Sequence, residues 1–182
     1  MRGSEGEACM GWETDKATNL EWYKQETDWG CPYSCVAMVL NWIKAQKCDE
    51  KDVRERAATG SLMWPEDPTK RSEGAALGLV RSLLMAYGID AAAEREPNWY
   101  SLANFEKLQS EASPDSPAVL GLRWSSNDLH LVVCVGKQSN STSVRIVDPG
   151  FGVVLNPLGF GYQAGANKGT FNQEVIEVLG TY

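Results

Sequence analysis

The residues best suited to carry out chemistry are a lone histidine and an aspartate 18 positions later. His130 is the only histidine in the 182-residue chain, and it opens the apolar run 130–135, while the next such run ends at Asp148. If the two runs pair as a β-hairpin with its turn centred near residues 139 and 140, Asp148 lies beside His130 across the strands. A carboxylate there fixes the tautomer of the ring and stabilises the imidazolium.

Cys31 is the candidate nucleophile that such a pair would serve. Pro32 suits the first position of a helix, so the sequence places Cys31 at the helix N-cap. The positive end of the helix dipole and the unpaired N–H groups of the first turn favour a thiolate there. Gln25, six residues upstream, would supply a side-chain N–H beside the backbone N–H of Cys31. Two such donors form an oxyanion hole, so these residues together predict acyl-transfer chemistry.

Each of these residues also has a simpler interpretation. A free cysteine is usually a small buried hydrophobic side chain, and we assign that role to Cys35, one helical turn beyond Cys31. A lone strand histidine such as His130 is more often a core residue. The Asp-Pro-Gly sequence at 148–150 is ordinary turn chemistry, and a loop glutamine such as Gln25 is usually only solvated. Position and spacing favour the catalytic interpretation for the four residues Cys31, His130, Asp148 and Gln25. For Gln25 the only support is its spacing of six residues from Cys31.

Three short blocks carry a resemblance to a known family. They read QETDWGCPYSCVAM at 25–38, HLVVCVG at 130–136 and IVDPGFG at 146–152. Their order and content resemble papain-like cysteine peptidases, closest to the double-glycine leader peptidase domains of bacterial ABC exporters. Papain-like secreted effector proteases are similar too. Pro32 stands where the exporter domains usually have glycine, and Asp148 stands where papain has asparagine.

The resemblance implies a cysteine protease with Cys31, His130, Asp148 and Gln25 as its catalytic residues and without a cofactor. It implies cleavage of a protein or peptide substrate after glycine. It also suggests a bacterial effector or toxin, made in the cytoplasm and delivered to a target cell by a dedicated secretion system, with a cognate immunity protein as partner. Composition does not separate an injected protein from a resident cytosolic one.

Two aromatic residues close in sequence to Cys31 and His130 are expected at the substrate cleft. Trp29 and Trp124 would bind substrate there and narrow the cleft around glycine. Two other functions are compatible with the same residues. A papain-like fold also serves glutamine deamidases and transglutaminases, and a peptidase fold that loses its nucleophile becomes a binding module.

Hydrophobic periodicity and capping signals predict an α+β fold, in which an N-terminal helical part with a central buried helix packs on a C-terminal antiparallel sheet. We expect one domain at 13–182, preceded by a flexible N-terminus at 1–12. The residues 156–170 read as a glycine-rich loop, and 171–179 as either a strand or a short helix. The predicted helices lie at 31–47, 49–60, 75–87 and 101–111, and the predicted strands at 118–124, 130–135, 143–148 and 152–155.

Composition excludes several classes of function. The net charge is −7, which argues against nucleic acid as a partner, because a polyphosphate needs a basic surface. No apolar run approaches the roughly 20 residues that span a bilayer, and the N-terminus does not resemble a signal peptide. Five cysteines are an odd number and do not suggest a disulfide framework. Their spacing also lacks the paired short intervals of structural zinc sites.

Overall fold

The computed structural model describes residues 11–63, 73–94, 101–138 and 141–181. Its helices are α1 (Cys31–Lys44), α2 (Glu50–Thr59), α3 (Glu73–Ala86) and α4 (Leu102–Glu111). Its strands are β1 (Trp12–Thr14), β2 (Glu21–Tyr23), β3 (Ile89–Glu94), β4 (Ala118–Trp124), β5 (Leu129–Lys137), β6 (Ser143–Asp148), β7 (Gly152–Pro157), β8 (Gly161–Ala164) and β9 (Asn167–Thr181).

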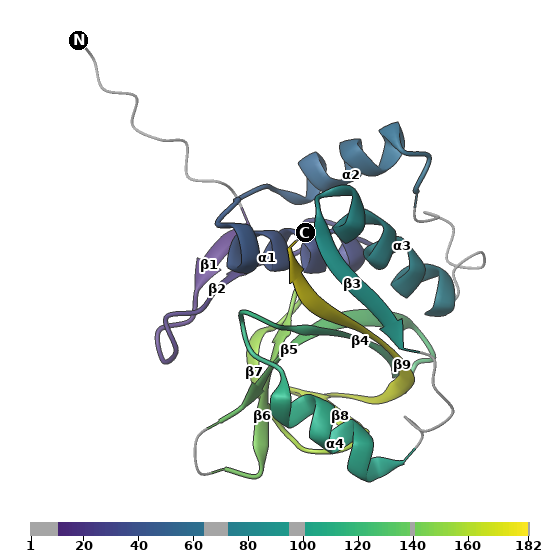
Figure 1. Ribbon diagram of the computed structural model, residues 1–182. Helices are drawn as coiled ribbons and strands as arrows, with labels where there is room; N and C mark the ends of the chain where they lie inside the picture. Colours follow the sequence, from purple (N-terminus) through teal and green to yellow (C-terminus); the bar gives the residue numbers. More distant parts are fainter. Residues whose placement is uncertain (1–10, 64–72, 95–100, 139–140, 182) are drawn as a thin grey trace.

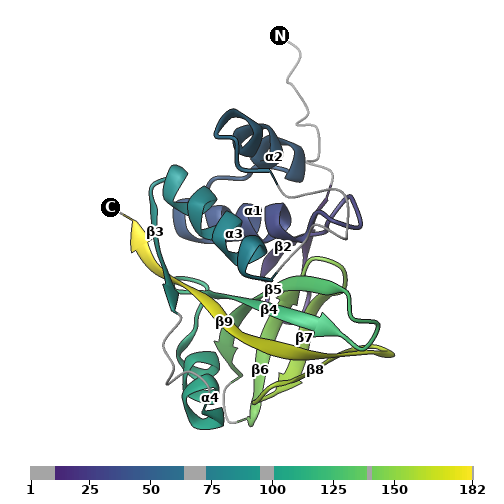
Figure 2. The same ribbon diagram turned by 90° about the vertical axis from the view of Figure 1, so that its right-hand side faces the viewer.

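An antiparallel sheet separates the helices into two groups. Its strand order is β3-β9-β4-β5-β6-β7, with β8 also paired to β9. The helices α1, α2 and α3 lie on one side of this sheet, and α4 lies on the other (Figures 1 and 2). The mixed helix and antiparallel sheet architecture confirms the predicted α+β class.

Alternation along β5 explains why each face of the sheet has its own core. Leu131, Val133 and Val135 belong to the cluster that contains α1 and α3. Val132 and Cys134 belong to the cluster on the α4 side. Successive side chains of a strand point to opposite faces, so the almost entirely apolar run is buried on both.

The helix α1 forms the centre of the first core, and every residue from Cys31 to Leu40 is buried. The prediction that Cys31 is the N-cap was wrong by one residue. Gly30 is the N-cap, so Cys31 is the first residue of the helix and Pro32 the second. The N–H of Ser34 donates to the carbonyl of Gly30 at 3.0 Å and closes the first turn. Cys31 remains in that first turn, where backbone N–H groups lack helical partners.

The predicted hairpin between β5 and β6 is present. Val133 pairs with Val147 and Cys134 with Ile146. Continuing this register places Asp148 opposite Val132 rather than His130, on the same face of the sheet as both. Asp148 is therefore a diagonal neighbour of the imidazole. The predicted centre of the turn, residues 139 and 140, lies outside the described residues.

The prediction of a loop at 156–170 was wrong. Residues 161–164 form β8, and β9 begins at Asn167 and continues through the segment that we left undecided. β8 and the start of β9 pair with each other as a tight hairpin, and β9 also pairs with β3 and β4 from earlier in the chain. Likewise, Trp12 belongs to β1, although we expected it in the flexible N-terminus, because its ring packs against Tyr23 at 5.3 Å. Residues 1–10 lie outside the described part.

Candidate active site

A buried histidine and a buried aspartate lie together where β5 begins and β6 ends. Nε2 of His130 lies 2.8 Å from Oδ1 of Asp148, and the two side chains are 9% and 0% exposed. Asp148 also performs the turn function suggested by Asp-Pro-Gly, since its Oδ1 accepts the N–H of Gly150 at 2.7 Å. Nε2 of the ring is thus occupied, which leaves Nδ1 to face another group.

The thiol of Cys31 is the group that meets the ring. Burial lowers the pKa of His130, but hydrogen bonds to Asp148 and Cys31, together with the negative charges of both, raise it to about 10. A ring with this pKa is protonated at neutral pH, so its positive charge lies beside the sulfur of Cys31. The N-terminus of α1, the start of β5 and the end of β6 therefore meet at this site.

The other described thiols have environments that keep them protonated. Burial raises the pKa of Cys35 well above its ordinary value, and the charges of Cys31 and Asp148 raise it further. Burial also raises the pKa values of Cys48 and Cys134 to about 12. Cys35 is fully buried, as expected for a core residue. Cys9 lies outside the described residues.

Gln25 is attached to the turn that carries Asp148. Its backbone N–H donates to the carbonyl of Pro149 at 2.9 Å. Its side-chain Nε2 donates to the carbonyl of Thr27 at 3.1 Å. An amide nitrogen carries two hydrogens, so this bond orients the side chain and leaves a second hydrogen for a ligand. Gln25 lines the cleft that also contains His130.

The loop between Gln25 and α1 is held in place by a carboxylate from α2. Glu50 is fully buried. Its Oε2 accepts the backbone N–H of Glu26 at 2.8 Å, and its Oε1 accepts the hydroxyl of Thr27 at 2.7 Å. The hydroxyl of Ser34 lies 3.5 Å from Oε2. Glu50 thus ties the loop to the first turn of α1.

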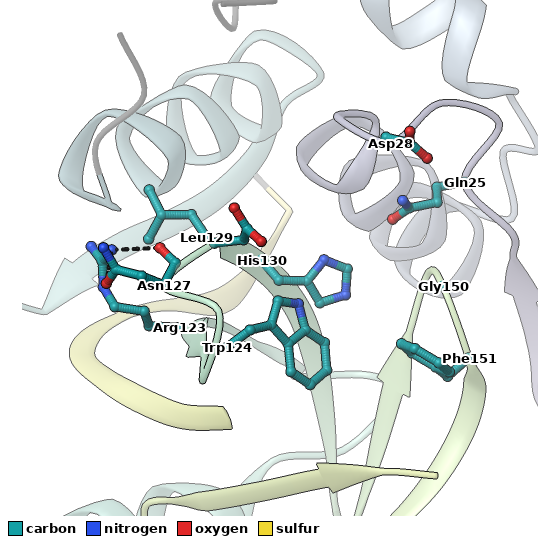
Figure 3. A pocket seen from close by; sticks show the side chains of 10 residues that line it. Gln25, Asp28, Arg123, Trp124, Asn127, Leu129, His130, Gly150 and Phe151 are labelled. Atoms are coloured by element: carbon teal, nitrogen blue, oxygen red, sulfur yellow. Dashed lines mark hydrogen bonds between the residues drawn. The ribbon is translucent and has the colours of Figure 1, made fainter. Parts of the chain in front are cut away.

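The cleft has a volume of about 650 Å³ and opens beside His130. Figure 3 shows Gln25 and Asp28 on one side of it, with Trp124 and Phe151 on the other. The Trp124 ring stacks on the imidazole with a centroid distance of 5.5 Å and an interplanar angle of 29°. Stacking of this kind covers one face of the ring and limits its motion.

Of the two tryptophans predicted at the cleft, the structure places only Trp124 there. Trp29 is not among the residues that line the cleft in the described part of the chain. It packs edge-on against Tyr33 at 6.2 Å and beneath the guanidinium of Arg54 at 5.2 Å. The Trp29 ring therefore contacts residues of α1 and α2 rather than the sheet. Phe151 is the second aromatic residue that lines the cleft.

Comparisons with known proteins agree with this geometry at the level of the fold. No protein-family model matches the sequence, and no curated protein is significantly similar to it. Among solved structures, the peptidase domain of Streptococcus ComA, a bifunctional ABC transporter involved in quorum sensing, aligns with a TM-score of 0.56. It is 14% identical, over 87% of this chain and 96% of that one. The chain has a papain-like peptidase fold.

A second relative with this papain-like fold is a double-glycine-motif protease from an AMS/PCAT transporter, solved with its leader peptide. Its TM-score is 0.50 and its identity 21%, over 82% of this chain and 89% of that one. The Pseudomonas avirulence protein AvrPphB aligns with a TM-score of 0.35 and 9% identity, over 70% and 74% of the two chains. That last likeness is too distant to bear on the function.

Three side chains at the candidate site were not predicted from the sequence. Phe151 directly follows Asp-Pro-Gly, and that position was a usable signal. Glu50 begins a helix, where an acidic residue is ordinary, so nothing marked it as buried. Tyr162 lies 2.7 Å from Asp148 through its hydroxyl, within a segment that we expected to be a loop.

The described residues contain no group of three or more His, Cys, Asp or Glu side chains placed to hold a metal ion. In the same part of the chain, none of the helices has the length and hydrophobicity that crossing a membrane requires.

The raised pKa of His130 leads to a prediction about pH. A histidine whose folded pKa exceeds its ordinary value of 6.5 stabilises the fold fully below pH 6.5 and loses that contribution as the pH rises toward 10. We expect Asp148→Asn to lower the ring pKa toward 6.5, because the hydrogen-bonded charge is gone. Proton NMR measures this directly, since the chain has one histidine.

The matched control is Asp128→Asn. Asp128 lines the same cleft but hydrogen-bonds to Ser126 rather than to the ring. This variant is expected to leave the His130 titration unchanged. A titration that is equal in wild type and Asp148→Asn would contradict the assigned contact.

Proposed function

We propose that the chain is a cysteine endopeptidase with Cys31 as nucleophile, His130 as acid and base, Asp148 as the orienting carboxylate, and Gln25 in the oxyanion hole. One observation carries this proposal. His130 contacts Asp148 through Nε2 and at the same time meets the thiol of Cys31 at the N-terminus of α1. That arrangement is what a thiolate–imidazolium nucleophile requires.

The reaction follows from these positions. The thiolate of Cys31 attacks the carbonyl carbon of the scissile bond, and the oxyanion accepts hydrogen bonds from the Gln25 amide and the Cys31 backbone N–H. The imidazolium of His130 gives its proton to the leaving amine, and a thioester remains on the sulfur. Neutral His130 then takes a proton from water, which attacks the thioester and releases the acid. Asp148 holds the ring in one orientation throughout.

We propose a peptide substrate with glycine before the cleaved bond. The aromatic rings of Trp124 and Phe151 lie edge to face at 6.0 Å on the cleft wall next to His130. Bulky rings at that position restrict the space for a substrate side chain. The solved double-glycine-motif protease with its leader peptide is a relative of the same fold. A role as a secreted effector that is countered by an immunity protein is part of the same proposal.

The experiment is to incubate the purified chain with a peptide library that contains Gly-Gly, Gly-Ala and Ala-Ala sites and to identify products by mass spectrometry. We expect new termini after glycine and no cleavage at Ala-Ala. Intact peptides in which a glutamine has become glutamate would instead identify a deamidase. Peptides left unchanged in sequence and mass would favour a binding module.

A further inference from the structure

Beyond the four residues of the proposed mechanism, Asp148 has a further hydrogen-bond partner, which comes from β8. We propose that Tyr162 is a positioning residue, whose hydroxyl fixes the carboxylate of Asp148 so that Asp148 holds His130 toward Cys31. The expected effect of Tyr162 on peptide cleavage rests on the proposed function. Its expected effect on the position of Asp148 and on the pKa of His130 does not.

The hydrogen bonds of Asp148 show why this contact matters. Oη of Tyr162 donates to Oδ2 at 2.7 Å, while Oδ1 faces His130 at 2.8 Å and accepts the N–H of Gly150 at 2.7 Å. Asp148 is fully buried, and Tyr162 is 3% exposed. Both carboxylate oxygens are therefore used, and the group cannot rotate without leaving a buried donor unpaired.

The hydroxyl of Tyr162 remains a donor at every working pH. Burial raises its pKa far above the ordinary value, and the charge of Asp148 and the hydrogen bond to it raise it further. A phenol in this state always presents its proton to the carboxylate. The contact therefore supplies a constant hydrogen bond to the same carboxyl group that faces His130.

The ring of Tyr162 is held independently of its hydroxyl. It packs against Trp124 at 5.5 Å and against Phe171 at 5.3 Å. On the backbone, β8 pairs Tyr162 with Gly169 of β9. Phenylalanine at position 162 would keep this packing and remove only the oxygen, so Tyr162→Phe tests the hydrogen bond alone.

We expect Tyr162→Phe to lower kcat for peptide cleavage about 10- to 100-fold, which is the range for loss of one hydrogen bond to a buried charge. KM should stay unchanged, because Tyr162 does not line the cleft beside His130. The pKa of His130, measured by NMR, should fall from about 10 toward 6.5, since Asp148 is no longer held against the ring.

Two comparisons separate positioning from simple packing. Phe171→Leu disturbs a neighbour of the Tyr162 ring without touching Asp148, so the His130 titration should stay unchanged. In an Asp148→Ala background, adding Tyr162→Phe should change neither the His130 titration nor the alkylation rate of Cys31. The proposal is overturned if Tyr162→Phe leaves the titration as in wild type, or if its effect persists without Asp148. The NMR titration can be measured even if the chain cleaves no peptide. A failure of the proposed peptidase function can therefore be distinguished from a failure of the proposed role of Tyr162.

Discussion

Replacing Cys31 with alanine is expected to lower kcat for cleavage of a Gly-Gly peptide by about 10,000-fold or more, the scale of losing the nucleophile from a catalytic triad. No other described thiol is placed to replace it, because burial keeps Cys35, Cys48 and Cys134 protonated. Cys31 lies at the helix terminus and packs only its small side chain into the core. The fold should therefore survive, as measured by circular dichroism and thermal unfolding.

The matched control is Cys48→Ala, which removes a buried thiol that has no contact with His130 and should retain cleavage. Labelling with iodoacetamide at neutral pH gives a second measurement that needs no substrate. We expect modification of wild type at Cys31 before Cys35 or Cys48. Wild-type cleavage by Cys31→Ala would exclude the proposed nucleophile, and equal labelling of all three thiols would favour a binding role.

Replacing Glu50 with alanine is expected to reduce the free energy of unfolding by about 1–3 kcal/mol, since two partly buried donors lose hydrogen bonds that contribute about 0.5–1.5 kcal/mol each. Those donors are the N–H of Glu26 and the hydroxyl of Thr27, held at 2.8 and 2.7 Å. Cleavage should also fall, because the same loop carries Gln25 into the cleft. Urea unfolding monitored by tryptophan fluorescence provides the measurement.

Glu55→Ala provides the control on the same helix. Its side chain is 68% exposed and pairs with the equally exposed Lys51 at 3.8 Å, so we expect a change within about 0.5 kcal/mol. Gly30→Ala tests the position of the Glu50 carboxylate as well, since a Cβ at residue 30 would clash with Oε2 of Glu50. Its cost should shrink in the Glu50→Ala background. Equal costs in both backgrounds would show that Glu50 does not hold this loop.

Features governed by neighbouring residues could be predicted from the sequence. Asp49 caps α2 with the reciprocal bonds of a capping box, and Ser101 caps α4 through its hydroxyl. The strands β4 to β7 follow β-branched runs with turn residues between them. The pairing of His130 with Asp148 was also accessible, because one short hairpin fixes both residues.

Features that depend on distant partners could not be predicted. Glycine-rich residues near 160–170 resembled a loop, yet Gly169 is required because a Cβ there would lie 2.9 Å from Cδ1 of Leu122 and 3.0 Å from the carbonyl of Arg123. That requirement exists only once β9 lies beside β4. The hydrogen bond of Tyr162 to Asp148 depends on the same pairing, so no local pattern could reveal it.

The place of β9 in the sheet has a consequence for biosynthesis. β9 lies between β3 and β4, and its pairing of Thr181 with Ile89 joins residues far apart in the chain. Because β9 leaves the ribosome after every other strand of this sheet, β3 and β4 lack a shared neighbour until translation has passed it. Such long-range pairing also folds slowly. A nascent chain is therefore expected to complete this sheet only late in its synthesis.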